Sequence, residues 1–281
     1  MTAPRERRIA LPHLTLAALE WGNASAPPLL ALHGWLDNAA SFATLAPLLA
    51  RHYRVIALDL PGHGQSDHLP AGVGYHFTDH VRAVLAALDA LELPRCALLG
   101  HSLGAGIASL TAAAAPGRVT RLHLIEGLGP LGDDGARTLQ RYRDTLAAPP
   151  ADGKALRLFR SIEQAASARA IASGLAAALA RPIIERGLRE TEGGWQWRSD
   201  PRLVRPTAIR LAETQIRALL AGIEAPTSLL LSQPATPYLP TAQMQARAAC
   251  VPHIAVEHMD GGHHLQLEHP QAVATWMESV L

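Results

Sequence analysis

Short apolar runs alternate along most of the chain with longer segments in which Ala and Leu recur at helical spacing. Six runs of four or five residues are rich in Leu, Ile, Val or Ala, as expected of strands buried on both faces of a parallel sheet. They cover residues 29–32, 54–58, 95–99, 121–125, 227–231 and 253–256. The predicted helices cover residues 43–50, 78–91, 103–115, 242–249 and 270–280. This alternation predicts an α/β fold with a mostly parallel sheet and helices on both of its faces.

Two stretches depart from the alternation. Near the N-terminus, residues 8–11 and 14–20 predict two more strands that turn at Pro12-His13. From Gly129 to about Gly222 no buried strand is predicted, only helical spacing with a turn at residues 193–197. We therefore expect a core made of residues 1–128 and 223–281, with residues 129–222 inserted as a helical lid.

Composition and charge narrow the class of protein. The chain has 281 residues, of which 48% are hydrophobic and 17% charged, so it can bury a full core. The net charge is only +1 and the basic residues are scattered, which excludes a nucleic-acid surface. No apolar run reaches the ~18 residues of a membrane span. The apolar stretch near the N-terminus is interrupted by Pro12 and Glu20, so we predict no export signal and a cytoplasmic protein.

Fourteen histidines make a metal site worth considering. The nearest candidate set is His76 and His80 with Asp79, but no partner motif accompanies it. We therefore predict neither a metal nor any other cofactor.

The motif that carries chemistry is Gly100-His101-Ser102-Leu103-Gly104, a G-x-S-x-G between a predicted strand and a predicted helix. A serine in that place lies at the apex of a strained turn, and the glycines on either side avoid collisions of Cβ atoms. The start of the helix favours negative charge developing near the serine. This context predicts Ser102 as a nucleophile.

A serine nucleophile needs hydrogen-bond donors for the oxyanion that forms on its substrate. The predicted strand at residues 29–32 ends in His33-Gly34-Trp35, where glycine lets the loop place a backbone N–H over the site. We predict that the N–H groups of Trp35 and Leu103 form the oxyanion hole. His33 is interpreted as part of the scaffold.

The base is sought on the loop Asp260-Gly261-Gly262-His263-His264, after the last predicted strand. We favour His263 over His264 because it follows directly on the two flexible glycines. An acid commonly follows the preceding strand, yet residues 232–240 contain no Asp or Glu. Glu126, at the end of the strand next to the serine turn, is the predicted acid, and Asp37 is its main rival.

The order of these motifs resembles the α/β-hydrolase superfamily. The strand with its His-Gly loop, the loop at residues 59–66, the G-x-S-x-G motif and the sequence from Gly262-His263 to Pro270 all occur in that order. Residues 32–38 together with 195–202 resemble the serine hydrolase-like proteins more closely. The resemblance implies the same roles for Ser102, His263, Trp35 and Leu103, and gives Glu126 a precedent. It also implies an eight-stranded sheet.

These features predict a serine hydrolase that cleaves a carboxylic ester with a neutral, largely apolar acyl group. Trp35 and four aromatic residues of the expected lid are candidate substrate contacts: Tyr142, Phe159, Trp195 and Trp197. Ordinary helix packing would equally explain the lid residues. The alternatives are a thioesterase, an aminopeptidase or a C–C hydrolase or lyase with the same three residues, or a binding protein that has kept only the fold.

Overall fold

Eight strands form a single sheet in the computed structural model, which describes residues 3–147, 157–205 and 207–279. The strands are β1 (Arg5–Ala10), β2 (Thr15–Trp21), β3 (Pro28–Leu32), β4 (Arg54–Leu58), β5 (Cys96–His101), β6 (Val119–Ile125), β9 (Thr227–Gln233) and β10 (Ile254–Asp260). Their order is β1-β2-β4-β3-β5-β6-β9-β10, and only the β1–β2 and β2–β4 pairs are antiparallel. The expected eight-stranded, mostly parallel sheet is confirmed.

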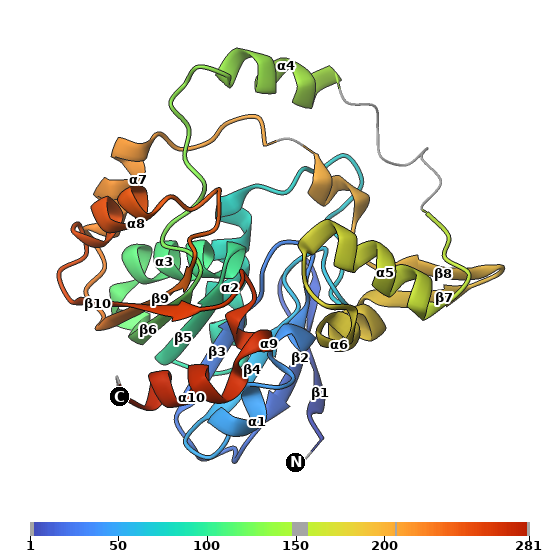
Figure 1. The fold of residues 1–281 in the computed structure, drawn as a ribbon, viewed down its shortest axis with the longest axis horizontal. Coiled ribbons are helices and arrows are strands. Elements are labelled where there is room, and N and C mark those ends of the chain that lie inside the picture. The colour runs from blue at the N-terminus through green and yellow to red at the C-terminus, as the bar shows by residue number, and fades with distance from the viewer. Residues whose placement is uncertain (1–2, 148–156, 206, 280–281) are drawn as a thin grey trace.

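Helices pack on both faces of this sheet (Figure 1). They are α1 (Ala46–Leu49), α2 (Phe77–Ala90), α3 (Leu103–Ala114), α7 (Glu213–Leu220), α8 (Thr241–Ala248), α9 (Leu265–Glu268) and α10 (Pro270–Ser279). Neighbouring side chains of β3 enter opposite layers, since successive residues of a strand point to opposite faces. Leu30 lies in the apolar layer that holds Val84 and Ile107, and Leu29 lies in the layer that holds Leu49 and Val273. The predicted end of the last helix, Val280, is outside the described residues.

One predicted strand differs from the expectation in its surroundings. Residues 253–256 were expected to be buried on both faces, but β10 is the edge strand of the sheet. Most of its side chains are exposed. It pairs with β9 along one side only. The four residues of the expected strand were too few to show from the sequence how deeply it is buried.

The segment between β6 and β9 is the longest connection between two strands of the sheet. It forms α4 (Thr138–Ala147), α5 (Ile162–Ser173), α6 (Ala177–Gly187), a hairpin of β7 (Leu188–Thr191) and β8 (Gly194–Trp197), and the 3₁₀ turn Pro201–Val204. The expectation of a simple turn at residues 193–197 was wrong, because these residues start with a turn and continue as β8. Gly193, with φ 91°, and Gly194, with φ 145°, allow the two-residue reversal.

This segment is docked on the sheet through polar contacts from α6. The amide of Asn38 donates to the carbonyl of Ile183 at 2.7 Å. Arg186 is buried between two carboxylates, with Nη2 2.9 Å from Asp59 Oδ2 and Nη1 2.7 Å from Glu6 Oε1. Because Asp59 is itself fully buried, its charge depends on this arginine for compensation.

Three buried histidines support the loops that follow β3 and β4. His33 donates from Nδ1 to the Gly34 carbonyl at 2.7 Å and accepts at Nε2 from the Leu60 N–H at 3.0 Å, which fits its interpretation as scaffold. Its ring lies 5.0 Å from that of His63, which lies 6.1 Å from that of His80. Burial lowers the pKa of His33 and His80 to about 4 and that of His63 to about 3. All three are therefore neutral at pH 7.

We expect these histidines to make the fold sensitive to acid. Each takes up a proton near pH 6.5 when unfolded but only near pH 3 to 4 when folded, so stability is complete above pH 6.5 and falls as the pH drops toward 4. One histidine contributes up to about 1.4 kcal/mol per pH unit to this loss. Urea unfolding of His80→Gln between pH 7 and 5 should show a shallower decline than the parent protein. The control His258→Gln, on exposed β10, should leave the slope unchanged, and an equal slope for both variants would contradict the prediction.

Candidate active site

Ser102 lies at the sharp turn between β5 and α3. Its backbone has φ 52° and ψ −112°, a conformation that is strained for any residue with a side chain. The turn is possible because its neighbours are small. A Cβ atom on Gly104 would lie 2.0 Å from the Leu32 carbonyl oxygen, and one on Gly100 would lie 2.5 Å from the Gly104 carbonyl oxygen. The Ser102 N–H donates to the Ile125 carbonyl at 2.9 Å, which places the serine beside the end of β6.

Two backbone N–H groups next to this turn are available as donors. Leu103 is the first residue of α3, so its N–H has no acceptor within the helix. Trp35 follows the His33-Gly34 turn at the end of β3, and among the described residues no acceptor engages its N–H. The Trp35 indole is half-exposed, and its Nε1 donates to the Leu203 carbonyl at 3.1 Å. The side chain thus rests against the 3₁₀ turn of the segment between β6 and β9.

His263 follows the two glycines after β10. Its Nδ1 lies 3.0 Å from Glu126 Oε2. Donation from Nδ1 to the carboxylate leaves Nε2 free to accept a proton. The His263 carbonyl accepts from His101 Nε2 at 2.8 Å, and the two rings are 4.9 Å apart. Since His101 directly precedes Ser102, this contact holds the His263 loop against the serine turn. His264 points elsewhere, with Nε2 3.7 Å from Asp37 Oδ2.

Glu126 lies directly after β6 and is almost fully buried. Besides His263, it accepts hydrogen bonds from the Ser232 N–H at 2.5 Å and from the Thr236 hydroxyl. Burial acts to raise the pKa of Glu126, but the hydrogen bonds from His263, Thr236 and Ser232 together lower it below its ordinary value. Glu126 is therefore a carboxylate at neutral pH.

The end of β9 and the loop after it contain no acidic residue but supply hydrogen-bond donors to Glu126. Ser232 near the end of β9 and Thr236 in the loop donate to its carboxylate, and the ring of Tyr238 meets that of His263 edge-to-face at 5.2 Å. Burial, with the negative charges of Glu126 and Asp37, raises the pKa of Tyr238 to about 12. The sequence reasoning missed these three residues. A search for hydroxyl groups in the loop, and not only for carboxylates, would have found Thr236 and Tyr238.

Asp37, the rival acid, is buried but lies among other partners. Its carboxylate accepts from the Ser41 hydroxyl at 3.1 Å and pairs with Arg169 of α5. It lies 4.0 Å from Nδ1 of His101 and 3.7 Å from Nε2 of His264. The structure thus brings Glu126 to His263, and Asp37 to His264.

The aromatic residues expected to line the site have different surroundings. Phe159 is 1% exposed, packs edge-to-face on Trp197 at 5.5 Å, and pairs through its backbone with Trp195. Its ring packs inside this apolar cluster, and a contact with substrate stays a prediction for Phe159. Trp195 and Trp197 pack on the same cluster, and a role for them toward substrate stays a prediction. Tyr142 is half-exposed on α4.

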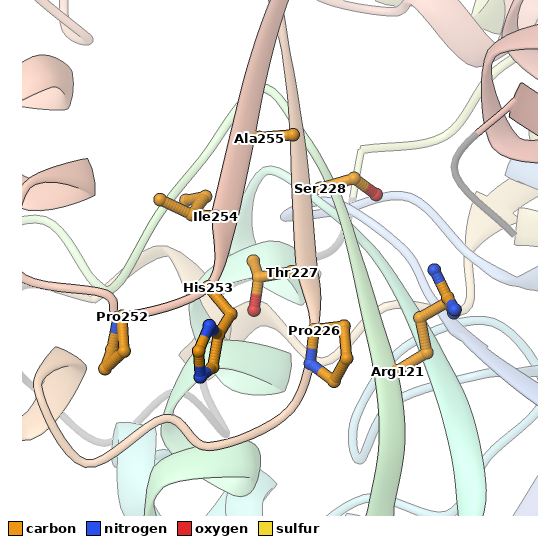
Figure 2. Close-up of a pocket in the computed structure, with 8 residues that line it drawn as sticks. All are labelled: Arg121, Pro226, Thr227, Ser228, Pro252, His253, Ile254 and Ala255. Carbon is orange, nitrogen blue, oxygen red and sulfur yellow. The ribbon is translucent and has the colours of Figure 1, made fainter.

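A pocket lies away from the serine turn. Figure 2 shows a shallow pocket lined by Arg121, Thr227, His253 and neighbouring residues at the amino ends of β6, β9 and β10. It lies at the opposite ends of the strands from Ser102, which follows the carboxyl end of β5, because the amino ends of parallel strands lie together. Across residues 3–147, 157–205 and 207–279, no group of three His, Cys, Asp or Glu side chains is arranged to hold a metal ion. Within the same residues no helix is long and apolar enough to cross a membrane.

Comparisons with known proteins agree with the fold. A family model described as the alpha/beta hydrolase fold matches residues 27–170, about half of the chain. The chain is 29% identical to a serine hydrolase-like protein of Danio rerio, over 97% of this chain and 87% of that protein. It is 30% identical to a probable serine hydrolase of Drosophila melanogaster, over 96% and 85%.

Solved structures extend the comparison. A hypothetical protein of Pseudomonas aeruginosa is 37% identical and superposes with a TM-score of 0.88, covering 98% of this chain and 97% of that one. A thioesterase domain from the curacin biosynthetic pathway is 24% identical with a TM-score of 0.85, covering 99% and 100%. The second likeness concerns the fold alone.

Proposed function

Because the chain belongs to the α/β-hydrolase family, in its serine hydrolase-like branch, we propose that it hydrolyses carboxylic esters through Ser102, His263 and Glu126. The observation that carries the proposal is the 3.0 Å contact between His263 Nδ1 and Glu126 Oε2, beside a strained serine turn. A buried carboxylate that orients an imidazole near a partly buried serine is the arrangement that acyl transfer requires.

The same groups act in both halves of the proposed reaction, formation of the acyl-enzyme and its hydrolysis. Ser102 Oγ attacks the acyl carbonyl while Nε2 of His263 takes its proton, and the ionised Glu126 stabilises the imidazolium that results. The N–H groups of Trp35 and Leu103 donate to the oxyanion, each contributing about 3 kcal/mol. His263 returns the proton to the leaving alcohol, which leaves an acyl group on Ser102. Water, activated by His263, then releases the acid and restores the serine.

We assign the segment from residue 129 to 222 as the lid of this site, over a core of residues 1–128 and 223–281. The assignment rests on its contacts with the loop after β3: Asn38 meets α6, Trp35 meets the 3₁₀ turn, and Asp37 meets α5. Tyr142 is the aromatic residue of the lid that we propose to contact substrate, because it is half-exposed on α4.

A neutral, apolar acyl group fits the side chains that surround the catalytic groups. Trp35 and Tyr238 are each about half exposed, and Tyr238 already lies against His263. The carboxylate of Glu126 lies against His263, and that of Asp37 lies against His264. A negatively charged acyl group would meet aromatic surface and be repelled by these two buried carboxylates, with the Arg169 cation already paired to Asp37.

The proposal is tested by hydrolysis of p-nitrophenyl esters from acetate to decanoate. We expect turnover of the neutral esters, and a kcat/KM at least about 10-fold lower for p-nitrophenyl hemisuccinate than for p-nitrophenyl butyrate, because the added carboxylate loses solvation without finding a free cation. The two acyl groups are similar in length, so the comparison isolates charge. Turnover of every ester at the rate of the buffer blank would overturn the proposed function. Preference for the hemisuccinate would overturn only the substrate class.

A further inference from the structure

Asp37 stands at a junction between the loop that carries the Trp35 N–H and the two turns that carry Ser102 and His263. Its buried carboxylate is 4.0 Å from His101, the residue before Ser102, and 3.7 Å from His264, the residue after His263. It is therefore next to a neighbour of Ser102 and to a neighbour of His263. A buried charge in this place can only be retained if it is compensated.

The compensation comes from the lid. Burial lowers the pKa of His101 far below its ordinary value, and burial likewise lowers that of His264, so both rings are neutral near pH 7. Within the described part of the chain, the cation in contact with Asp37 is Arg169 of α5, whose side chain is 16% exposed. α5 begins with Ser161 as a cap, which accepts from the Gln164 N–H at 3.2 Å.

Arg169 also reaches the backbone of the loop it stabilises. Its Nη1 donates to the Leu36 carbonyl at 3.4 Å. Leu36 has φ 59°, in the left-handed region that a leucine adopts only when its surroundings impose it. Leu36 links Trp35 to Asp37, so the same arginine contacts both residues that follow Trp35. The direction of the Trp35 N–H thus depends on contacts made by the lid.

We propose that Asp37 and Arg169 are positioning residues for ester hydrolysis: their ion pair holds the loop from Trp35 to Asp37 so that the Trp35 N–H points at the oxyanion. This rests on the proposed function, and it makes the lid a part of the catalytic machinery rather than only a cover for the substrate. Without Arg169, the carboxylate of Asp37 is left buried and uncompensated, and the loop relaxes toward water. A donor displaced by about 1 Å can cost on the order of 10²-fold in rate.

The test uses the full chain with Asp37→Asn, Arg169→Met and the double variant. With p-nitrophenyl butyrate, each single variant should lower kcat about 10- to 100-fold with KM changed by less than about 2-fold, because the loss falls on the transition state. The double variant should be no slower than the slower single variant, since the two residues act as one unit. Arg181→Met is the matched control: it removes an arginine from α6 that is exposed and paired with Glu185. It should keep the parent kcat.

Two further measurements separate positioning from a merely structural role. Active sites are counted with a fluorophosphonate that labels Ser102, so that kcat refers to folded protein. Affinity for an alkyl trifluoromethyl ketone, which forms an oxyanion on the serine, should fall by the same factor as kcat/KM in each variant. Arg169→Lys keeps the charge without the planar fork, so it should lose less kcat than Arg169→Met. It replaces Arg169→Met in the test if that variant does not fold.

The results that overturn the proposal are distinct from those that overturn the proposed function. A parent-like kcat in Arg169→Met or in Asp37→Asn, or single losses that multiply in the double variant, excludes positioning by this pair. A loss of about 10⁴-fold in Asp37→Asn with a parent-like Glu126→Gln would make Asp37 the acid of the triad and overturn it too. If the parent protein hydrolyses no ester and the fluorophosphonate does not label Ser102, the proposed function fails, and this inference fails with it.

Discussion

Replacing Ser102 by alanine is expected to lower kcat for p-nitrophenyl butyrate by about 10⁶-fold. In the proposed mechanism the hydroxyl oxygen forms the acyl intermediate, and without it the remaining groups can only assist direct attack by water. The N–H donors at Trp35 and Leu103 would still leave a small residual rate. The measurement is kcat per folded protein, together with the loss of stoichiometric labelling by a fluorophosphonate.

Ser66 provides the matched control, since it also lies in a Gly-x-Ser sequence, Gly64-Gln65-Ser66. Its hydroxyl donates to the Asp59 carbonyl at 2.6 Å and accepts from the Ala17 N–H at 2.8 Å. Ser66→Ala should therefore cost about 1–3 kcal/mol of stability, because two buried groups lose their partner, while Ser102 is still labelled. If Ser102→Ala retains the parent rate, Ser102 is not the nucleophile.

Glu126→Gln is expected to lower kcat by about 10⁴-fold, the second largest effect. The amide has nearly the same shape but no charge to stabilise the imidazolium of His263, and it can present an N–H where the Nδ1–H needs an acceptor. The pKa of Glu126 is lowered, so the stabilisation from its ionised form is present above its ordinary pKa and is lost as the pH falls below it. The variant should thus also be less stable at pH 7 than the parent.

The comparison with Asp37→Asn decides between the two carboxylates. Both variants replace a buried acid by its amide, so the loss of one negative charge is matched. The proposed assignment requires the larger loss in Glu126→Gln, by about 100-fold or more over Asp37→Asn. Equal losses in the two variants would mean that neither acid acts alone on His263.

The local motifs were the most predictable part of the protein. The turn at Ser102 could be predicted because a strand-to-helix turn around a serine leaves no room for side chains at Gly100 and Gly104. The two glycines that this restriction requires are visible in the sequence. The strands of the sheet were likewise visible as apolar runs. The hairpin β7–β8 was missed because its strands have only four residues each and are only partly buried, so that too few alternate positions exist to show a period of two.

Contacts between distant segments were the least predictable part. The hydrogen bond from the Ser232 N–H to Glu126 is made by the backbone, so no residue type in the sequence indicates it. Arg169 is one of many arginines in a chain whose basic residues are, with the exception of Lys154, all arginine. Its pairing with Asp37 depends on how α5 docks on the loop after β3, and only tertiary structure reveals that. Phe159 could equally have packed inward or faced a substrate, since an isolated aromatic residue between Arg157 and Arg160 shows no periodic apolar pattern.

The place of Glu126 directly after β6 has a consequence for how specificity can diversify. In the proposed triad the acid follows a strand next to the serine turn, so the end of β9 and the loop after it have no carboxylate to preserve. This segment must keep the Ser232 N–H, which any residue other than proline provides, and a hydroxyl at position 236. The rest of the loop, including Tyr238 against His263, is open to exchange. Loop grafting between relatives at residues 237–240 is therefore a route to new acyl preferences that leaves the proton-transfer chemistry intact.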